Sequence, residues 1–129
     1  MSKMQRNKGA SGERELFAIL SDLLGVTVKR GLVATREGGA DSLDVPGWAI
    51  ECKRVEKPDI NAWWNQAIDQ AARTGRKPVL FWRASRRPWS AFIDPHHINP
   101  STYPHQGQHD PVQMSAAAWA QLAREEISK

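Results

Sequence analysis

The residues best suited to chemistry stand close together in one short segment. Asp41 comes first, a turn marked by Pro46-Gly47 follows, and Glu51 and Lys53 come directly after a brief apolar run. Carboxylate oxygens are the ligands that Mg²⁺ and Mn²⁺ prefer in proteins. A charged lysine is no metal ligand, but it steadies a phosphate or a developing negative charge. The segment therefore predicts a compact site for a divalent cation, with a cationic side chain beside it.

A strand over residues 48–54 would position two of these side chains. Successive side chains of a strand point to opposite faces, so Glu51 and Lys53 share one face while Ile50 and Cys52 share the other. The apolar face is the natural core face. The carboxylate of Asp41 would then reach the site from the turn that precedes the strand.

A third carboxylate comes from a predicted helix over about residues 9–24. Glu13 lies three residues before Leu16, at the N-terminal end of an amphipathic stripe made of Leu16, Ile19, Leu20, Leu23 and Leu24. A carboxylate aimed at the protein interior needs a partner, which a metal site would supply. The alternative is an acid that favours the helix dipole.

These residues resemble a known signature. Asp41 followed by Glu51-Cys52-Lys53 resembles the PD-(D/E)xK motif of a nuclease superfamily. The opening segment 8–16 resembles the first helix of the archaeal-type Holliday junction resolvases and their phage relatives. Ala40 stands where the motif has proline, so Asp44 remains the rival of Asp41 for the first acid.

The resemblance implies a metal-dependent DNA endonuclease that acts on four-way junctions, with a C2 dimer as the working form. Glu13, Asp41 and Glu51 would bind Mg²⁺ or Mn²⁺, and Lys53 would orient the attacking water or stabilise the transition state. Gln66, on the helix after the E-x-K strand, would lie near the metal or the DNA. A solvated glutamine is the alternative for Gln66.

Hydrophobic patterns predict the remaining elements. We expect strands at 26–30, 78–83 and 89–94, a helix from Asp59 to about Thr74, and a last helix at 116–127. Trp63 and Trp64 lie on the apolar stripe of the middle helix, which favours core packing over base stacking. With the resemblance, this order implies an α/β fold, a central mixed sheet flanked by helices, in one domain over 1–129.

Basic residues predict a polyanionic partner. The net charge is +4 and the pI about 9.6. The stretch 70–93 contains six basic residues and no acid, and residues 1–8 form a basic N-terminal arm. Beside a metal site such cations favour phosphate binding over a merely solvated face. The candidate DNA-binding residues are Lys3, Arg6, Lys8, Arg36, Arg73, Arg76, Lys77, Arg83, Arg86 and Arg87.

The segment 95–113 is predicted to be irregular because it holds four prolines, and it also carries all four histidines. Its His97-Ile98-Asn99-Pro100 run faintly resembles an H-N-H nuclease fragment, but that chemistry needs a ββα unit. Zinc binding by His105 and His109 lacks further ligands in sequence. We expect polar loop histidines here.

Composition indicates a globular protein without a membrane span or a signal peptide. A single cysteine excludes an internal disulfide and fits a reducing cytosol, so we expect a cytoplasmic, nucleoid-associated protein of a bacterial or phage-infected cell. Two alternatives stay open beside the resolvase: a non-catalytic DNA-binding module with a nuclease-like fold, and a PD-(D/E)xK nuclease acting on another DNA structure.

Overall fold

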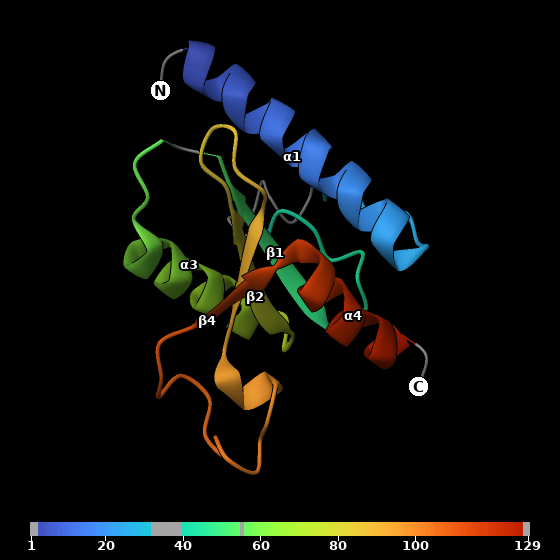
Figure 1. Ribbon diagram of the computed structural model, residues 1–129. Helices are drawn as coiled ribbons and strands as arrows, with labels where there is room; N and C mark the ends of the chain where they lie inside the picture. The colour runs from blue at the N-terminus through green and yellow to red at the C-terminus, as the bar shows by residue number, and fades with distance from the viewer. Residues whose placement is uncertain (1–2, 32–39, 55, 128–129) are drawn as a thin grey trace.

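A four-stranded mixed sheet forms the centre of the molecule in the computed structural model, which describes residues 3–31, 40–54 and 56–127, with side chains from Ser11 onward (Figure 1). The strands lie in the order β1-β2-β3-β4. β1 (Trp48–Lys53) pairs in parallel with β2 (Lys77–Trp82), and β3 (Ser90–Ile93) and β4 (Val112–Ser115) continue the sheet in antiparallel pairing. The predicted mixed sheet is confirmed.

Helices cover both faces of this sheet (Figure 1). α1 (Lys3–Leu24) and α4 (Ala116–Ile127) pack on one face, where Leu16, Ile50 and Trp119 are fully buried. α3 (Ile60–Ala72) packs on the other face, where Trp64 and Ala67 meet Leu80 and Phe92. Within the described ranges, no helix is both long enough and apolar enough to cross a membrane.

The alternation predicted for β1 is confirmed, and it decides which chemistry faces which helix. Ile50 and Cys52 are buried in the core beneath α1 and α4. Ala49, the middle residue of the apolar run 48–50, packs instead against Ala71 of α3. Glu51 and Lys53 share the face of Ala49 because side chains alternate along a strand. The acid and the lysine therefore lie on the α3 side of the sheet.

The two later helices begin where the sequence predicts. Asp59 caps α3 by accepting a hydrogen bond from the backbone N–H of Ala62 at 3.3 Å. Ser115 accepts one from Ala118 N–H at 3.0 Å at the start of α4. Trp64 is buried and Trp63 half-buried, which confirms their packing role.

Two segments differ from the sequence prediction. Residues 26–30 form no strand, because side chains satisfy their backbone donors: Val28 N–H donates to Ser21 Oγ at 2.9 Å and Lys29 N–H to Asp44 Oδ2 at 2.9 Å. The segment 95–113 is less irregular than expected. It contains the short 3₁₀ helix η1 (Pro95–His97) and the start of β4, whose edge position explains its weak apolar pattern.

Candidate active site

Asp41 stands beside β1 because the chain around it folds back as a tight hairpin. Ser42 and Ile50 form an antiparallel bridge, and Ile50 carbonyl accepts from Asp41 N–H at 2.9 Å. Gly47, with φ of 86°, makes the turn that Pro46-Gly47 predicts. The Asp41 side chain also bonds to the backbone of β1, because Cys52 N–H donates to Asp41 Oδ2 at 2.8 Å. The hairpin thus holds a buried carboxylate against the strand.

Glu51 and Lys53 complete the cluster on β1. Lys53 Nζ lies 3.6 Å from Glu51 Oε1, and the Lys53 side chain is a quarter exposed whereas that of Glu51 is buried. Glu51 Oε2 is buried without a hydrogen-bond partner among the described residues. A buried carboxylate oxygen that lacks a donor is unfavourable unless a proton or a cation satisfies it.

Glu13 reaches the same region from α1, but it already has a cationic partner. Its Oε2 lies 3.5 Å from Nε of the half-exposed Arg30. Its charge interacts with those of Asp41 and Lys53, so the helix does bring the third acid toward the hairpin and β1. Within the part of the chain that the structure describes, however, no three acidic, histidine or cysteine side chains converge closely enough to hold a metal ion directly.

Burial raises the pKa values of all three acids, and the charge of Asp41 adds to the rise in the other two. Burial and the neighbouring Asp41 carboxylate raise the pKa of Glu51 to about 8. Burial also raises the pKa of Asp41, although the hydrogen bond from Cys52 and the charge of Lys53 oppose this. Burial and the charge of Asp41 raise the pKa of Glu13. Carboxylates that repel one another in a partly buried site are typical of catalytic and cation-binding positions.

The rival acid Asp44 lies elsewhere. Its carboxylate accepts the Lys29 N–H, and its side chain is exposed at the far end of the hairpin turn from Lys53. Asp41 is the acid that contacts β1. This geometry favours Asp41 as the first acid of the cluster.

The comparison with protein families adds the decisive observation. A model of the family described as "Phage putative PDDEXK endonuclease" matches residues 4–127, which is nearly the whole chain. The chain belongs to this family. The resemblance seen in Asp41, Glu51 and Lys53 is therefore confirmed at the level of the nuclease superfamily.

The fold of this family member is also that of a known resolvase. The structure of Hjc, a Holliday junction resolvase from the archaeal hyperthermophile Archaeoglobus fulgidus, superimposes with a TM-score of 0.52 at 16% sequence identity. The match covers 90% of this chain and 95% of that chain. At this identity the likeness shows the fold alone. No curated protein is similar enough in sequence to match.

Gln66 of this nuclease-family chain is not drawn into the cluster. It is exposed on α3, whereas Gln70, one turn further on, is buried and its Oε1 has no hydrogen-bond partner among the described residues. The next residue, Ala71, packs on Ala40 and Ala49, which precede Asp41 and Glu51 by one and two residues. The two glutamines lie one helical turn apart, and packing distinguishes the buried Gln70 from the exposed Gln66.

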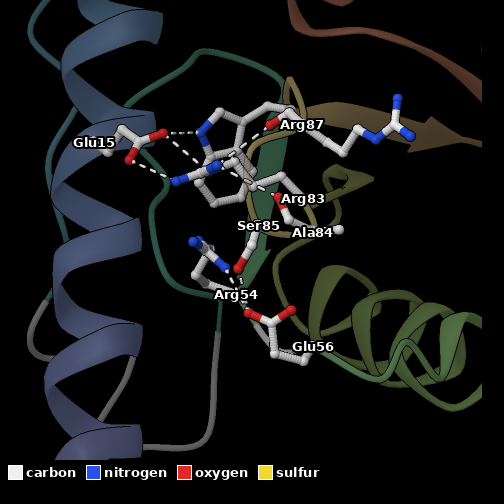
Figure 2. A network of polar contacts seen from close by, with 8 residues as sticks. Glu15, Arg54, Glu56, Arg83, Ala84, Ser85 and Arg87 are labelled. Atoms are coloured by element: carbon white, nitrogen blue, oxygen red, sulfur yellow. Dashed lines mark hydrogen bonds and ion pairs between the residues drawn. The ribbon is translucent and has the colours of Figure 1, made fainter.

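Three cations of the basic run have internal partners. Arg76 Nη1 donates to the carbonyls of Leu43, Val45 and Trp48 at 2.5, 3.3 and 3.2 Å, which ties the hairpin turn to the helix end. Lys77 Nζ lies 2.6 Å from Glu126 Oε1 and 4.8 Å from the centre of the Trp48 ring. Arg83 Nε lies 3.0 Å from Glu15 Oε1 (Figure 2). These side chains stabilise the fold before any DNA is considered.

The other basic candidates divide into two groups. Arg73, Arg86 and Arg87 are exposed. The side chains of Lys3, Arg6 and Lys8, and the whole of Arg36, lie outside the described residues. The DNA-binding prediction for these four stays a prediction.

The histidines form no site of their own. His96 Nδ1 lies 2.7 Å from the Tyr103 carbonyl, and His97 packs edge-on against Trp48, where burial lowers its pKa. His109 contacts the Tyr103 ring. The structure has η1 at this position and no ββα unit, so the H-N-H alternative lacks its framework.

Sequence reasoning missed two residues near the site. Arg54 follows Lys53 and is largely buried beside α1. Glu15 lies off the apolar stripe of α1, yet its carboxylate accepts a hydrogen bond from Trp89 Nε1 at 2.9 Å as well as pairing with Arg83. Glu15 has no local sequence signal because Arg83 and Trp89 are distant in the chain, and the contact of Arg54 with Gly12 of α1 is equally non-local.

Proposed function

We propose that this chain is a divalent-metal-dependent DNA endonuclease that hydrolyses phosphodiester bonds, with four-way junctions as its preferred substrate. The observation that carries the proposal is the buried pair Asp41 and Glu51 beside Lys53, within a chain of the PDDEXK endonuclease family. A protein that only binds DNA has no need for repelling, buried acids next to a lysine. The unfavourable cluster is understandable if a cation and a phosphate complete it.

The donor set fits Mg²⁺ or Mn²⁺. The candidate ligands are all carboxylate oxygens, and Glu51 Oε2 is a buried acceptor that no described donor satisfies. Asp41 and Glu51 would hold the ion, with Glu13 joining them after parting from Arg30. When bound, such an ion lowers the pKa of water and neutralises charge on a phosphate.

Lys53 would serve the phosphate rather than the metal. Its ammonium is partly exposed beside Glu51, so it can contact a substrate oxygen while keeping its carboxylate partner. Positioned cations of this kind stabilise the charge that develops on a phosphoryl group during hydrolysis. Arg30, which is half-exposed and paired with Glu13, would be a second cation near the proposed site.

The substrate assignment rests on the fold and on charge. The superimposed archaeal protein is a Holliday junction resolvase, and two symmetric cuts across a four-way junction suit a C2 dimer. The exposed Arg73, Arg86 and Arg87 would contact DNA backbone, as would the N-terminal arm and Arg36. Backbone contacts suit a branched substrate, which is recognised by shape more than by base sequence. We place this activity in the cytoplasm, where DNA is the accessible polyanion.

A cleavage panel tests the proposal. Wild type is incubated with labelled four-way junction, flap and linear duplex, in Mg²⁺, in Mn²⁺ and in a chelator. We expect metal-dependent nicking, fastest on the junction. Faster cutting of flap or duplex would overturn the junction assignment alone. Binding without nicking in either metal would favour a non-catalytic DNA-binding module.

A further inference from the structure

The connection between β2 and β3 projects at the active end of the sheet. Lys53 and Trp82 are paired residues at the ends of the parallel strands β1 and β2. The chain that follows Trp82 therefore leaves the sheet beside Lys53, and it turns through residues 84–88 before β3 begins (Figure 1). We call residues 84–88 the basic turn, since it contains Arg86 and Arg87 and no acid.

A single carboxylate on α1 holds both ends of this turn. Arg83 Nε and Nη2 lie 3.0 and 3.2 Å from the two oxygens of Glu15, and Trp89 Nε1 donates to Glu15 Oε1 at 2.9 Å. Arg83 also stacks over the Trp89 ring at 5.7 Å. Figure 2 shows the side chain of Arg83 pointing toward Glu15. Nη2 donates a hydrogen bond to Oε2, whereas Nε makes only an ion-pair contact with Oε1, and such charge-assisted contacts fix orientation as well as adding energy.

The same guanidinium also supports the turn from within. Arg83 Nη1 donates to the carbonyls of Ala84 and Arg87, at 3.4 and 3.3 Å. Ser85 Oγ donates to Glu56 Oε1, which in turn lies 3.6 Å from Arg54 Nη1 (Figure 2). Since Arg54 directly follows Lys53, the turn is tied to both α1 and the end of the catalytic strand. The Arg83 side chain therefore stabilises the conformation of the turn.

Arg86 occupies a strained backbone conformation at the tip of this braced turn. Its φ is 63°, and it is the one non-glycine residue with positive φ among those the structure describes. An L-residue with a side chain pays in stability for this region, whereas glycine adopts it readily. The exposed Arg86 side chain has no hydrogen bond or ion pair to any described residue. Nothing within the described chain explains why arginine stands where glycine would be more stable.

We propose that the basic turn is a pre-formed DNA-backbone contact, in which Arg86 binds a phosphate near the scissile one and Glu15 is a positioning residue that fixes the turn relative to Lys53. The inference rests on the proposed nuclease function, which it deepens by naming the phosphate contact. Residues in sparsely populated backbone regions persist where function requires them. Bracing also reduces the entropy lost when the turn binds DNA.

Substituting Arg86 separates stability from binding. Binding of a labelled four-way junction is measured in a chelator over a range of salt, and thermal melts are recorded without DNA. Arg86→Gly should raise the melting temperature by about 2–4 °C, while the slope of log K against log salt falls by about one unit. Arg86→Lys should keep the slope of wild type. Arg124→Gln is the matched control and should leave the slope unchanged. Arg124 lies on α4 and donates to the Leu23 carbonyl, at the end of α1 remote from the turn.

Glu15→Gln tests the positioning part by the sign of its effect. Removing an acid from a DNA-binding protein would, by charge alone, tighten binding. A loosened turn should instead weaken junction binding several-fold and slow nicking in Mg²⁺. Tighter binding by this variant would overturn the positioning role of Glu15.

The results for wild type and for Arg86→Gly test the nuclease function and the DNA contact of the basic turn separately. If wild type neither binds nor nicks the junction, the proposed function fails. If wild type does both and Arg86→Gly matches its affinity and salt slope, the function stands and the basic turn is not a DNA contact.

Discussion

Gly12 of α1 lies directly against Arg54, the residue that follows β1. A Cβ added at Gly12 would lie 2.7 Å from Arg54 Cβ and 2.8 Å from Arg54 Cγ. These atoms are close to the backbone, so they cannot swing aside as the end of a flexible side chain would. The missing side chain of Gly12 therefore allows α1 to cross the end of β1 closely enough to bring Glu13 toward Asp41.

We expect Gly12→Ala to destabilise the protein, although alanine is favoured over glycine in a helix by about 1 kcal/mol. Overpacking against Arg54 should outweigh that gain and cost about 1–3 kcal/mol. Displacement of Glu13 should also slow nicking. Denaturant unfolding and junction cleavage measure both effects, with the exposed neighbour Ser11→Ala as control. A more stable and fully active Gly12→Ala would contradict the close crossing.

Asp41→Asn and Asp44→Asn distinguish the two acids. Asn keeps an oxygen that can accept the Cys52 N–H, so Asp41→Asn should fold, bind junction DNA and lose about a hundredfold or more in cleavage rate. Asp44→Asn should cleave at nearly the rate of wild type. Glu51→Gln should behave as Asp41→Asn does. Should Asp44→Asn be the inactive variant while Asp41→Asn cuts, the two acids exchange roles.

Metal-free stability should fall as the pH rises. The pKa of Glu51 is about 8 in the folded chain, against an ordinary value of 4.5. Between these values the folded state holds a proton that the unfolded state has released, so this contribution to stability is complete below about pH 4.5 and is lost as the pH passes 8. Melts in a chelator from about pH 6 to about pH 9 should show the loss level off above 8. Glu51→Gln should flatten the profile. An equally steep profile in that variant would assign the proton elsewhere.

Glu13→Ala should separate a metal ligand from a helix-dipole acid. Removing one of three mutually repelling carboxylates should stabilise the metal-free protein or leave it unchanged, because the weak pair with half-exposed Arg30 offsets little. Mg²⁺ should raise the melting temperature of wild type more than that of Glu13→Ala. If Glu13 only favours the dipole, the variant should lose about 0.3–1 kcal/mol and show the Mg²⁺ increment of wild type.

Arg76 and Arg87 should respond differently to neutralisation, although both belong to one basic run in the sequence. Arg76→Gln removes donors from three carbonyls and should cost about 1–3 kcal/mol without changing the salt slope of DNA binding. Arg87→Gln should leave stability nearly unchanged and lower that slope. A salt slope of Arg87→Gln equal to that of wild type would show that Arg87 is solvated surface.

Sequence patterns were sufficient to predict the features that depend on residues close together in the chain. The alternation over β1 predicted which face Cys52 and Glu51 occupy, and the caps Asp59 and Ser115 marked where α3 and α4 begin. The E-x-K motif, an acid about ten residues earlier and the helical segment 8–16 together indicated the nuclease superfamily. These signals depend on neighbours within one turn or one strand, which a sequence displays directly.

Only the tertiary structure decided how distant residues share these elements. The apolar residues 26–30 predicted a strand, but Ser21 and Asp44 satisfy their backbone donors instead. Of two glutamines four residues apart on α3, packing buried Gln70 and exposed Gln66. Within the basic run 70–93, Arg76 and Arg83 bind partners inside the protein, whereas Arg86 lies at the tip of a turn in a strained backbone conformation. Burial and pairing depend on contacts across the whole chain, so composition and periodicity cannot specify them.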